Sequence, residues 1–447
     1  MATSETAGRS VTGETPPRDG EEARARASSS SRLMVWLSAG HGVKHFHQQG
    51  FLLLLPHIKD SLGLTDIAVG GIVGMRSLAM GAMNVPAGIL TDMFRRRIAL
   101  MLTASMLCLL VGYALIGLST HYLFVLLAVT VAGAGTSMWH APAFAELAAR
   151  YPDRKAMAIA AHRSGGSVGD SIAPFAVGLL LGGISFWGLN WGGFGWRTVA
   201  LLHVIPSSIT AVVILLTFKT AGVGAPTVVT FKQYLSAARP LFRNATVLSM
   251  VSVTALRGMA HTSFAAFLVL YLKDDLEYGD LKVGFHIGLL TLLGILAGPV
   301  MGAISDRVGR RPVILFGLIS MSALMWMFLW ADEGLALTVV LALLGVVLFS
   351  VNSIMTATAI DAVKSGTEGS AVAMIFTGGA IVGAIGPVLA GVINRSWEFQ
   401  GVIVYAASIA TVAAVIAAIA PIANPAAAPR GRGPAPVAGP GGGAGQG

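Results

Sequence analysis

Charged residues are scarce in this sequence. Asp, Glu, Lys and Arg make up 11% of its 447 residues, whereas hydrophobic residues make up 55%. A soluble protein of this size needs more charge to cover its surface, so the composition argues against an ordinary water-soluble protein. A membrane protein, whose outer surface faces lipid, has no such need.

Cysteine is almost absent as well. Cys108 is the single cysteine in the sequence, so no disulfide can form within the chain and no Cys-x-x-Cys or Cys/His metal motif exists. The sequence also lacks the G-x-x-x-x-G-K-[ST] run that cradles nucleotide phosphates, which argues against ATP as an energy source bound by this chain. We therefore expect no cofactor.

Long apolar stretches are abundant. Twelve of them, each about 20 residues and so long enough to cross a roughly 30 Å hydrocarbon layer, alternate with short polar connections. Six lie within residues 33–218 and six within residues 245–422. The pattern predicts an all-α polytopic membrane protein with twelve transmembrane helices in two bundles of six.

The remaining segments are predicted to be tails and a linker. Residues 1–32 are rich in Ser, Glu and Arg, residues 423–447 are rich in Ala, Pro and Gly, and residues 219–244 form a polar linker. Such compositions predict disorder at both ends. Basic residues concentrate after the even-numbered helices, so the positive-inside tendency places these connections and both termini in the cytoplasm.

The basic residues also indicate a partner. The formal net charge of +9 comes from Lys and Arg at helix ends. This placement favours a lipid bilayer and argues against nucleic acid. We expect a multi-pass protein, monomeric, in the plasma or inner membrane.

Two motifs occur twice at nearly the same separation. "GILTDMFRRR" begins at Gly88 and "GAISDRVGRR" begins at Gly302, while "GGSVGDSIAP" ends at Pro174 and "GGAIVGAIGP" ends at Pro387. Two unrelated motifs with a shared spacing indicate duplicated halves. Duplicated halves are the layout of many secondary transporters, whose substrate site lies between the repeats near mid-membrane.

The G-x-x-x-D-R-x-G-R-R pattern of the second copy resembles the signature loop of the major facilitator superfamily. The resemblance implies two pseudo-symmetric six-helix bundles and a latch that holds the outward-facing state. The latch residues that it implies are Gly88, Asp92 and Arg96 in the first copy and Gly302, Asp306, Arg307, Gly309, Arg310 and Arg311 in the second.

The first copy departs from this pattern. Met93 replaces a basic residue, and Arg95 stands where the second glycine is expected. For this copy a simpler interpretation remains open, in which the arginines only mark the cytoplasmic face.

A narrower resemblance involves three further stretches. "GHGVKHF" in the first apolar stretch, "GAGTSMWHAPAFAELAAR" in the fourth and "HRSGGSVGDSIAP" in the fifth are similar to fosmidomycin-resistance-type transporters. His41 and His140 match positions in that branch. Lys44, Arg76 and Arg257 have no assigned place in it, so its substrate is not transferred to this chain.

Three basic residues are expected deep in the bilayer. Lys44 lies about 16 Å into the first helix, and Arg76 lies near the middle of the second. Arg257, in the seventh helix, occupies the position that corresponds to Lys44 in the duplicated half. A lone cation at the bilayer centre costs at least about 2.5 kcal/mol, so each needs a compensating group.

Acids within the membrane are too few to compensate these cations. Asp170 and, nearer the edge, Glu146 are the plain candidates. The excess positive charge predicts a small organic anion, such as a carboxylate or a phosphonate, which arginine can hold with two parallel hydrogen bonds. The alternative is that the basic side chains snorkel or bond helix carbonyls in a structural role.

Polar residues near the cations extend this predicted site. His41, His45 and Gln48 follow one another at spacings of four and three, which places them on one helical face. Gln48 and Asn352 are expected to donate hydrogen bonds to the substrate. His41 and His140 are assigned to substrate binding on the resemblance, although His140 remains open as a packing residue.

Proton coupling is assigned to groups that titrate. Histidine changes charge near neutral pH, so His45, His261 or Asp170 is predicted to carry the proton, and a proton gradient is the expected energy source. A zinc site is not predicted, because no cysteine or carboxylate accompanies the histidines in sequence and His47 points away from them.

The predicted function is secondary active transport of a small organic anion by alternating access. An efflux antiporter for drugs or metabolites is the alternative within this fold. A membrane hydrolase is a distant one: "GGSVG", at residues 165–169, fits G-x-S-x-G, but that motif requires a strand, a turn and a helix. A nutrient sensor would need a cytoplasmic domain, which is not predicted, so we do not expect an enzyme or a sensor.

Overall fold

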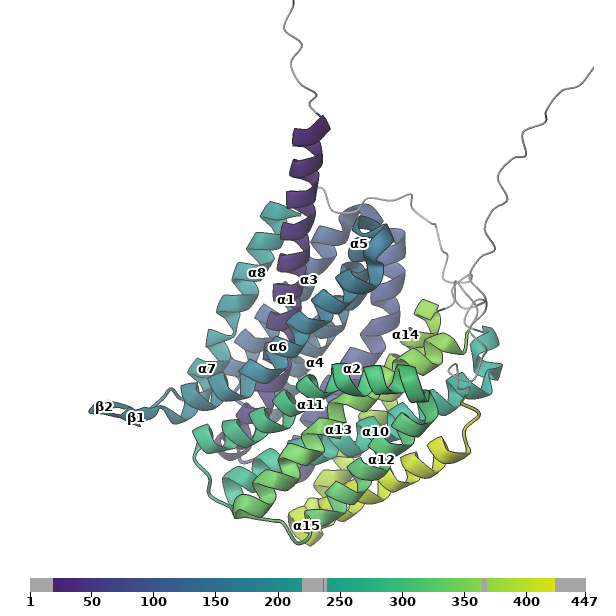
Figure 1. Cartoon of the computed structure of the whole chain (residues 1–447). Coiled ribbons are helices and arrows are strands. Elements are labelled where there is room, and N and C mark those ends of the chain that lie inside the picture. Colours follow the sequence, from purple (N-terminus) through teal and green to yellow (C-terminus); the bar gives the residue numbers. More distant parts are fainter. Residues whose placement is uncertain (1–18, 219–235, 237–238, 364–367, 423–447) are drawn as a thin grey trace, which may run out of the picture.

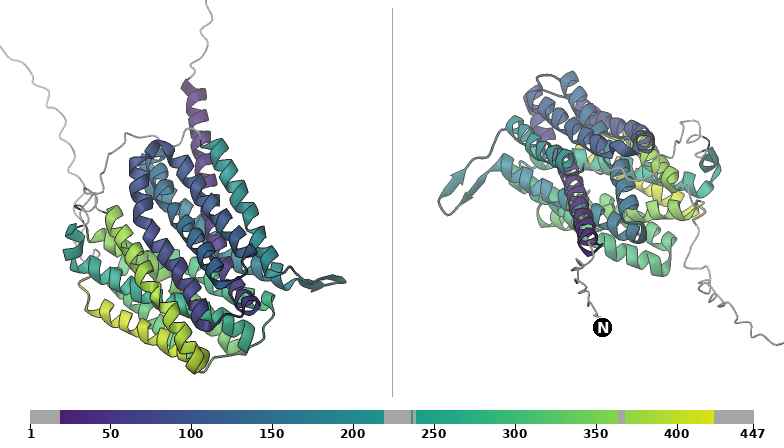
Figure 2. Two further views of the ribbon diagram at one scale, coloured as in Figure 1. Left: turned by 180° about the vertical axis from the view of Figure 1, so that it is seen from behind. Right: turned by 90° about the horizontal axis from the view of Figure 1, so that it is seen from above.

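A computed structural model describes residues 19–218, 236, 239–363 and 368–422. Figure 1 shows two helical bundles, one purple to teal and the other green to yellow. The view from behind in Figure 2 shows the same division. The predicted all-α fold in two six-helix bundles is confirmed.

The first bundle contains eight helices and two single-turn connections. Its helices are α1 Asp19–Leu62, α2 Asp66–Met93, α3 Ile98–Leu118, α4 Tyr122–Met138, α5 His140–Arg150, α6 Lys155–Gly182, α7 Trp196–Leu202 and α8 Val204–Thr217, with 3-10 turns η1 Arg95–Arg97 and η2 Pro152–Arg154. α4 with α5, and α7 with α8, each form one membrane crossing broken in the middle.

The second bundle begins with a 3-10 turn before its first long helix. Its elements are η3 Arg239–Arg243, α10 Ala245–Leu270, the π-helical turn η4 Tyr271–Asp275, α11 Asp280–Val308, α12 Arg310–Met327, α13 Gly334–Asp361, α14 Glu368–Gly383 and α15 Ile385–Ile419. Asn244 caps α10 by accepting from the Val247 amide at 3.1 Å, so the long helix starts where the predicted linker ends.

The helices are long enough to cross a bilayer. Within the described ranges, nine helical segments meet the length and hydropathy expected of a membrane span. One of them, Ala371–Ile419, breaks at Glu398 (φ 53°, ψ −165°) and so provides two crossings. Polar residues lower the hydropathy of α1 and α12, and these two helices bring the arrangement into agreement with the twelve crossings predicted.

The boundary predicted for the first tail is wrong. α1 starts at Asp19 and continues without interruption through residue 32, so residues 19–32 are helical. Its first part, DGEEARARA at residues 19–27, is rich in Ala, Glu and Arg, which are good helix formers, and the stretch extends a helix that the membrane segment has already nucleated. Residues 1–18, most of the linker and residues 423–447 lie outside the described residues.

A short β-hairpin between α6 and α7 was not predicted. Strands β1 Ile184–Phe186 and β2 Leu189–Trp191 pair in antiparallel register. Trp187 and Gly188 form its turn with φ of 45° and 83°, the left-handed geometry that two-residue hairpins prefer. Figures 1 and 2 show the hairpin projecting sideways from the bundle.

The two halves touch symmetrically through glycine and proline. A Cβ at Gly70 of α2 would lie 2.1 Å from the Pro387 carbonyl oxygen, and one at Gly284 of α11 would lie 2.4 Å from the Pro174 carbonyl oxygen. Gly70 and Gly284 are repeat-related, as are Pro174 and Pro387. The duplicated motifs therefore form the same close contact twice across the interface.

Two polar contacts join the halves at the end of the bundles where α1 ends and α2 begins. Lys59 Nζ is 3.3 Å from Asp274 Oδ2, and Asn394 donates to Asp66 at 2.9 Å. We call the opposite end, which carries Arg95–Arg97, Arg307, Arg310 and Arg311, the arginine-rich face. These two contacts join the halves at the end away from the arginine-rich face, and another, between Arg163 of α6 and Ser353 of α13 at 3.4 Å, lies nearer that face.

Candidate functional site

The candidate site forms where α1 crosses α6. A Cβ at Gly165 would lie 2.1 Å from the Ser38 carbonyl oxygen, and a Cβ at Gly169 would lie 2.0 Å from the Gly42 carbonyl oxygen. These glycines let the two backbones approach closely. The G-x-S-x-G run lies inside continuous helix here, so the strand-turn-helix context of a hydrolase is missing.

Two histidines and an aspartate form a hydrogen-bonded chain at this crossing. His45 Nδ1 lies 2.9 Å from Asp170 Oδ1, and its Nε2 lies 3.1 Å from His41 Nε2. His41 Nδ1 lies 2.9 Å from the carbonyl oxygen of His162. The predicted common face of His41 and His45 is confirmed, and Asp170 joins them from α6.

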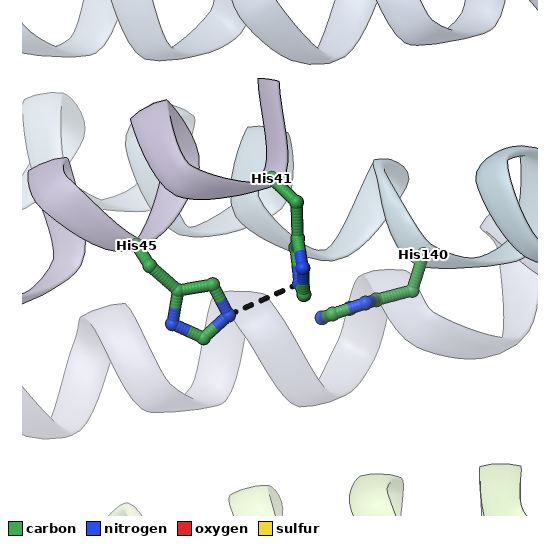
Figure 3. A group of neighbouring side chains, drawn as sticks. All are labelled: His41, His45 and His140. Carbon is green, nitrogen blue, oxygen red and sulfur yellow. Dashed lines mark hydrogen bonds between the residues drawn. The ribbon is translucent and has the colours of Figure 1, made fainter. Parts of the chain in front are cut away.

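His140 and Lys44 adjoin this chain. Figure 3 shows the rings of His41, His45 and His140 turned toward one another. Lys44 Nζ lies 2.8 Å from His140 Nε2, and only 2% of Lys44 is exposed. Because an ammonium can only donate, His140 Nε2 accepts this hydrogen bond. Both residues therefore belong to the same buried polar group.

The three rings do not form a ready metal centre. One nitrogen from each lies within 4.8 Å of the others. The His140 nitrogen already accepts from the Lys44 ammonium, so an ion would have to displace a positive charge and remain beside it. The arrangement suits hydrogen bonding and proton binding better than a divalent cation.

Arg76 lies near this group on α2. Its Nη1 donates to the Gln48 carbonyl oxygen at 3.1 Å, and its guanidinium lies over the Phe51 ring at 4.8 Å. The side chain is 8% exposed, and it lies close enough to Lys44 for electrostatic repulsion. Two positive charges are thus held together on the facing helices α1 and α2.

Arg257 occupies the second half. It is 7% exposed, and its Nη1 donates to the Leu348 carbonyl oxygen at 2.8 Å. Its buried Nε has no hydrogen-bond partner among the described residues. His261, one turn on, packs edge-on against Phe349 with ring centroids 5.4 Å apart. Within the described residues, Arg257 bonds neither Lys44 nor Arg76.

In the described parts of the chain, none of the three buried cations hydrogen-bonds an acidic side chain; Asp170 lies near Lys44, but its carboxylate bonds His45. Their hydrogen bonds go to His140, to Gln48 O and to Leu348 O. Asp170 bonds His45 at 2.9 Å, and the buried Glu146 bonds Arg150 at 2.9 Å. The two intramembrane acids are therefore engaged elsewhere, and the excess positive charge predicted from the sequence is present in the structure.

Gln48 and Asn352, the two predicted hydrogen-bond donors, take part in hydrogen bonds through their backbone carbonyls. Gln48 contacts Arg76 through its backbone carbonyl, not its side chain. Asn352 is half-buried on α13, where its carbonyl accepts from Thr356 at 2.9 Å. Their predicted role toward a substrate stays a prediction.

The predicted latch loops form their ion pairs within their own halves. Arg95 lies 3.4 Å from Asp92, and Arg310 lies 3.1 Å from Asp361 and also bonds Asp306. Nothing lies within 4 Å of a Cβ placed at Gly88 or Gly302, so neither glycine makes a close helix contact in this conformation.

The other latch residues differ in exposure. Arg96 and Arg307 are exposed, while Arg311 donates to the Ala418 carbonyl oxygen. Gly309 has φ 101° and ψ 161°, a conformation that is essentially restricted to glycine, and it separates α11 from α12. The backbone conformation at this junction therefore explains why position 309 is glycine, which its place in the motif alone does not.

His162, which is not among the predicted site residues, contacts His41 directly. Its ring stacks on His41 at 4.2 Å between centroids, and its carbonyl fixes His41 Nδ1. Its position, one residue before Arg163 in the glycine-rich stretch, was the available signal. His47, by contrast, does point away: its ring bonds the His203 carbonyl at 2.9 Å and Ser207 at 2.7 Å.

Duplicated bundles of membrane-crossing helices that meet beside buried cations define a membrane transporter. The family model of the Major Facilitator Superfamily matches residues 37–296 and 250–440, and the chain belongs to that superfamily. It is a multi-pass membrane protein.

Individual relatives are distant. The Fosmidomycin resistance protein of Escherichia coli is 23% identical over 65% of this chain and 68% of its own. The Multidrug resistance protein MdtG of Yersinia enterocolitica is 28% identical over 34% of this chain and 38% of its own. A bacterial homologue of the human lysosomal transporter Spinster, in an inward-facing and unoccupied conformation, superposes with a TM-score of 0.74 at 15% identity, over 87% of this chain and 96% of that one.

Proposed function

We propose that this protein is a secondary active transporter that moves a small organic anion, carrying a carboxylate or a phosphonate, across the membrane by alternating access. A proton gradient drives the transport. Lys44, Arg76 and Arg257 bind the anionic group, while His45, His261 or Asp170 carries the proton. No nucleic acid, metal or cofactor takes part, and the monomer is the working unit.

The observation that carries this proposal is the uncompensated charge of three buried cations. Lys44, Arg76 and Arg257 are at most 8% exposed, and their contacts are neutral acceptors or a ring face. Burying a charge without an opposite charge is unfavourable, and an anionic substrate relieves that cost. The orphan Nε of Arg257 supports the same conclusion, because it offers a donor that a substrate oxygen would satisfy.

Orientation completes the proposal. The arginine-rich face lies in the cytoplasm by the positive-inside tendency, with both termini on the same side of the plasma or inner membrane. Since the halves meet at the other end, the structure then corresponds to a state closed toward the outside.

An efflux antiporter is the second candidate. The names of the Escherichia coli and Yersinia enterocolitica relatives, which refer to drug resistance, favour it. Export of an anionic drug and import of an anionic nutrient require the same positive site, so the two candidates differ in direction and not in the residues that bind.

The experiment is flux into proteoliposomes. Purified protein is reconstituted, and uptake of a panel of carboxylates and phosphonates is measured with and without an inward proton gradient. Accelerated uptake of at least one anion under the gradient supports the proposal, whereas transport of neutral or cationic compounds alone contradicts it. Inverted vesicles test export in the same panel.

Arg257→Gln is the decisive variant, and Arg197→Gln is its matched control. Loss of charged hydrogen bonds worth about 1.5–3 kcal/mol predicts roughly a 10- to 100-fold fall in uptake efficiency for Arg257→Gln. Arg197 is exposed at the start of α7 and lies 3.1 Å from the Ser119 carbonyl, remote from the site, so its variant keeps full uptake. Undiminished uptake by folded Arg257→Gln would remove the assigned role.

A further inference from the structure

The hydrogen bonds at the α1–α6 crossing fix a number of protons. The His162 carbonyl oxygen can only accept, so His41 Nδ1 carries a hydrogen toward it. The contact of His45 Nδ1 with Asp170 Oδ1 at 2.9 Å needs one hydrogen, on either atom. The contact between the Nε2 atoms of His41 and His45 at 3.1 Å needs another, since two lone pairs repel.

These three contacts need one hydrogen more than the resting groups possess. A neutral His41, a neutral His45 and an ionised Asp170 together bring two such hydrogens. The third is an added proton, and with it the net charge of the three side chains is zero. Its exact position does not change the count, because moving it along the chain only exchanges which atom is the donor.

We propose that His41, His45 and Asp170 form a single proton-binding site that holds one proton in the conformation described here. The Proposed function names candidate carriers of the proton; this inference rests on it and deepens it by making His41 part of the carrier, by fixing the stoichiometry at one, and by leaving His261 outside.

Packing keeps the two rings in register. A Cβ at Gly166 would lie 2.6 Å from His41 Cε1 and 2.8 Å from His45 Cδ2, so only glycine leaves room for both rings at this point of α6. The stacked His162 ring holds the other face of His41. The lone pairs are therefore brought together by the fold, which strengthens the need for a bound proton.

The charged and titratable neighbours determine what the proton does. They are Lys44 on α1, His140 on α5, and His162 and Arg163 on α6. When the proton is bound, Asp170 is neutralised within the chain, and the Lys44 charge has no compensating acid. When the proton leaves, Asp170 regains its charge beside Lys44. An anion is therefore held best while the proton is present, which gives co-transport of one proton with one anion.

Nitrogen NMR tests the proton count without any substrate. Protein labelled with ¹⁵N-histidine is placed in lipid nanodiscs near neutral pH, and its ten histidines are observed. The expected result is a through-hydrogen-bond coupling between two Nε2 nuclei, one of which belongs to an imidazolium; His57, which bonds Asp280 at 2.8 Å, is assigned separately with His57→Gln. His41→Gln, His45→Gln and Asp170→Asn each lose that signal. His286→Gln keeps it, because His286 bonds Lys282 and Thr338 in the other half.

The wild-type spectrum alone decides the matter if a variant fails to fold. Neutral His41 and His45 rings with no nitrogen–nitrogen coupling between them would overturn the proposal. A coupling present in the wild type and retained in His286→Gln supports it. This result is independent of the flux panel: a panel with no transported anion contradicts the Proposed function, while the proton site is judged by NMR.

Discussion

Lys59→Gln tests how the end away from the arginine-rich face is held closed. Lys59 Nζ contacts Asp66 in its own half at 3.0 Å and Asp274 in the other half at 3.3 Å. Glutamine keeps most of the side-chain length but removes the charge. The change therefore weakens the contact with Asp274, which joins the halves, and also the contact with Asp66 within the first half.

The size of the effect follows from the exposure of the pair. The side chains of Lys59 and Asp274 are 24% and 27% exposed, so the contact is partly screened by water. Such pairs contribute about 0.2–1 kcal/mol. At about 1.4 kcal/mol for a factor of ten, losing the pair shifts the ratio of open to closed molecules by up to about fivefold.

Lys273→Gln is the matched control. Lys273 lies 2.9 Å from Asp280 with a similar exposure of 26%, but both residues belong to the second half. Asp280 also bonds His57 of the first half at 2.8 Å, and that bond remains when Lys273 is replaced, so the control removes the same charge without breaking a direct contact between the halves. The control variant should keep the wild-type distribution of open and closed molecules.

Spin labels report the opening. Ser61 at the end of α1 and Glu277 beside η4 are exposed residues of different halves, suited to nitroxide labelling after substitution by cysteine. Double electron–electron resonance in nanodiscs then measures the fraction of long distances. Lys59→Gln should raise that fraction. Equal distributions for Lys59→Gln and Lys273→Gln would refute the reasoning that this contact biases the closed state.

Three glycine substitutions give further predictions. Gly169→Ala places a methyl group against the Gly42 carbonyl and should lower the free energy of unfolding by about 1–3 kcal/mol, whereas the methyl group of Gly302→Ala meets nothing within 4 Å and should leave stability unchanged or raise it. Melting temperatures in detergent compare the two variants, and equal values would contradict the close helix crossing at Gly169. Gly309→Ala should destabilise by roughly 1–3 kcal/mol because of its φ of 101°, and an unchanged melting temperature would show that the α11–α12 junction relaxes.

Much of the fold was predictable because lipid imposes a simple rule. A segment that crosses the bilayer must hydrogen-bond its own backbone polar groups, which a helix does. Apolar stretches of sufficient length therefore predict transmembrane helices. The helix breaks before His140 and before Val204 were not predicted, since an apolar stretch looks the same whether the helix is straight or interrupted. The hairpin at residues 184–191 was not predicted, because its turn is formed by a Trp–Gly pair within an aromatic segment and not by a common turn sequence.

The candidate site was predictable in part. Spacing along α1 placed His41 and His45 on one face, since helical periodicity is a local property. The contact with Asp170 depends on how α1 and α6 are rotated relative to each other, which no local pattern encodes. The same holds for Lys44: its burial followed from its depth, but its partner, His140, lies on another helix.

The glycine-lined crossing has a consequence for engineering. Two turns of α6 supply both the room for the neighbouring backbone and the groups that bond His41 and His45, so a change there alters shape and protonation together. Under the proposed function, selectivity is better adjusted on α2 and α10, where Arg76 and Arg257 donate to backbone carbonyls away from the α1–α6 crossing. Variant libraries aimed at new cargo would therefore begin beside those two arginines.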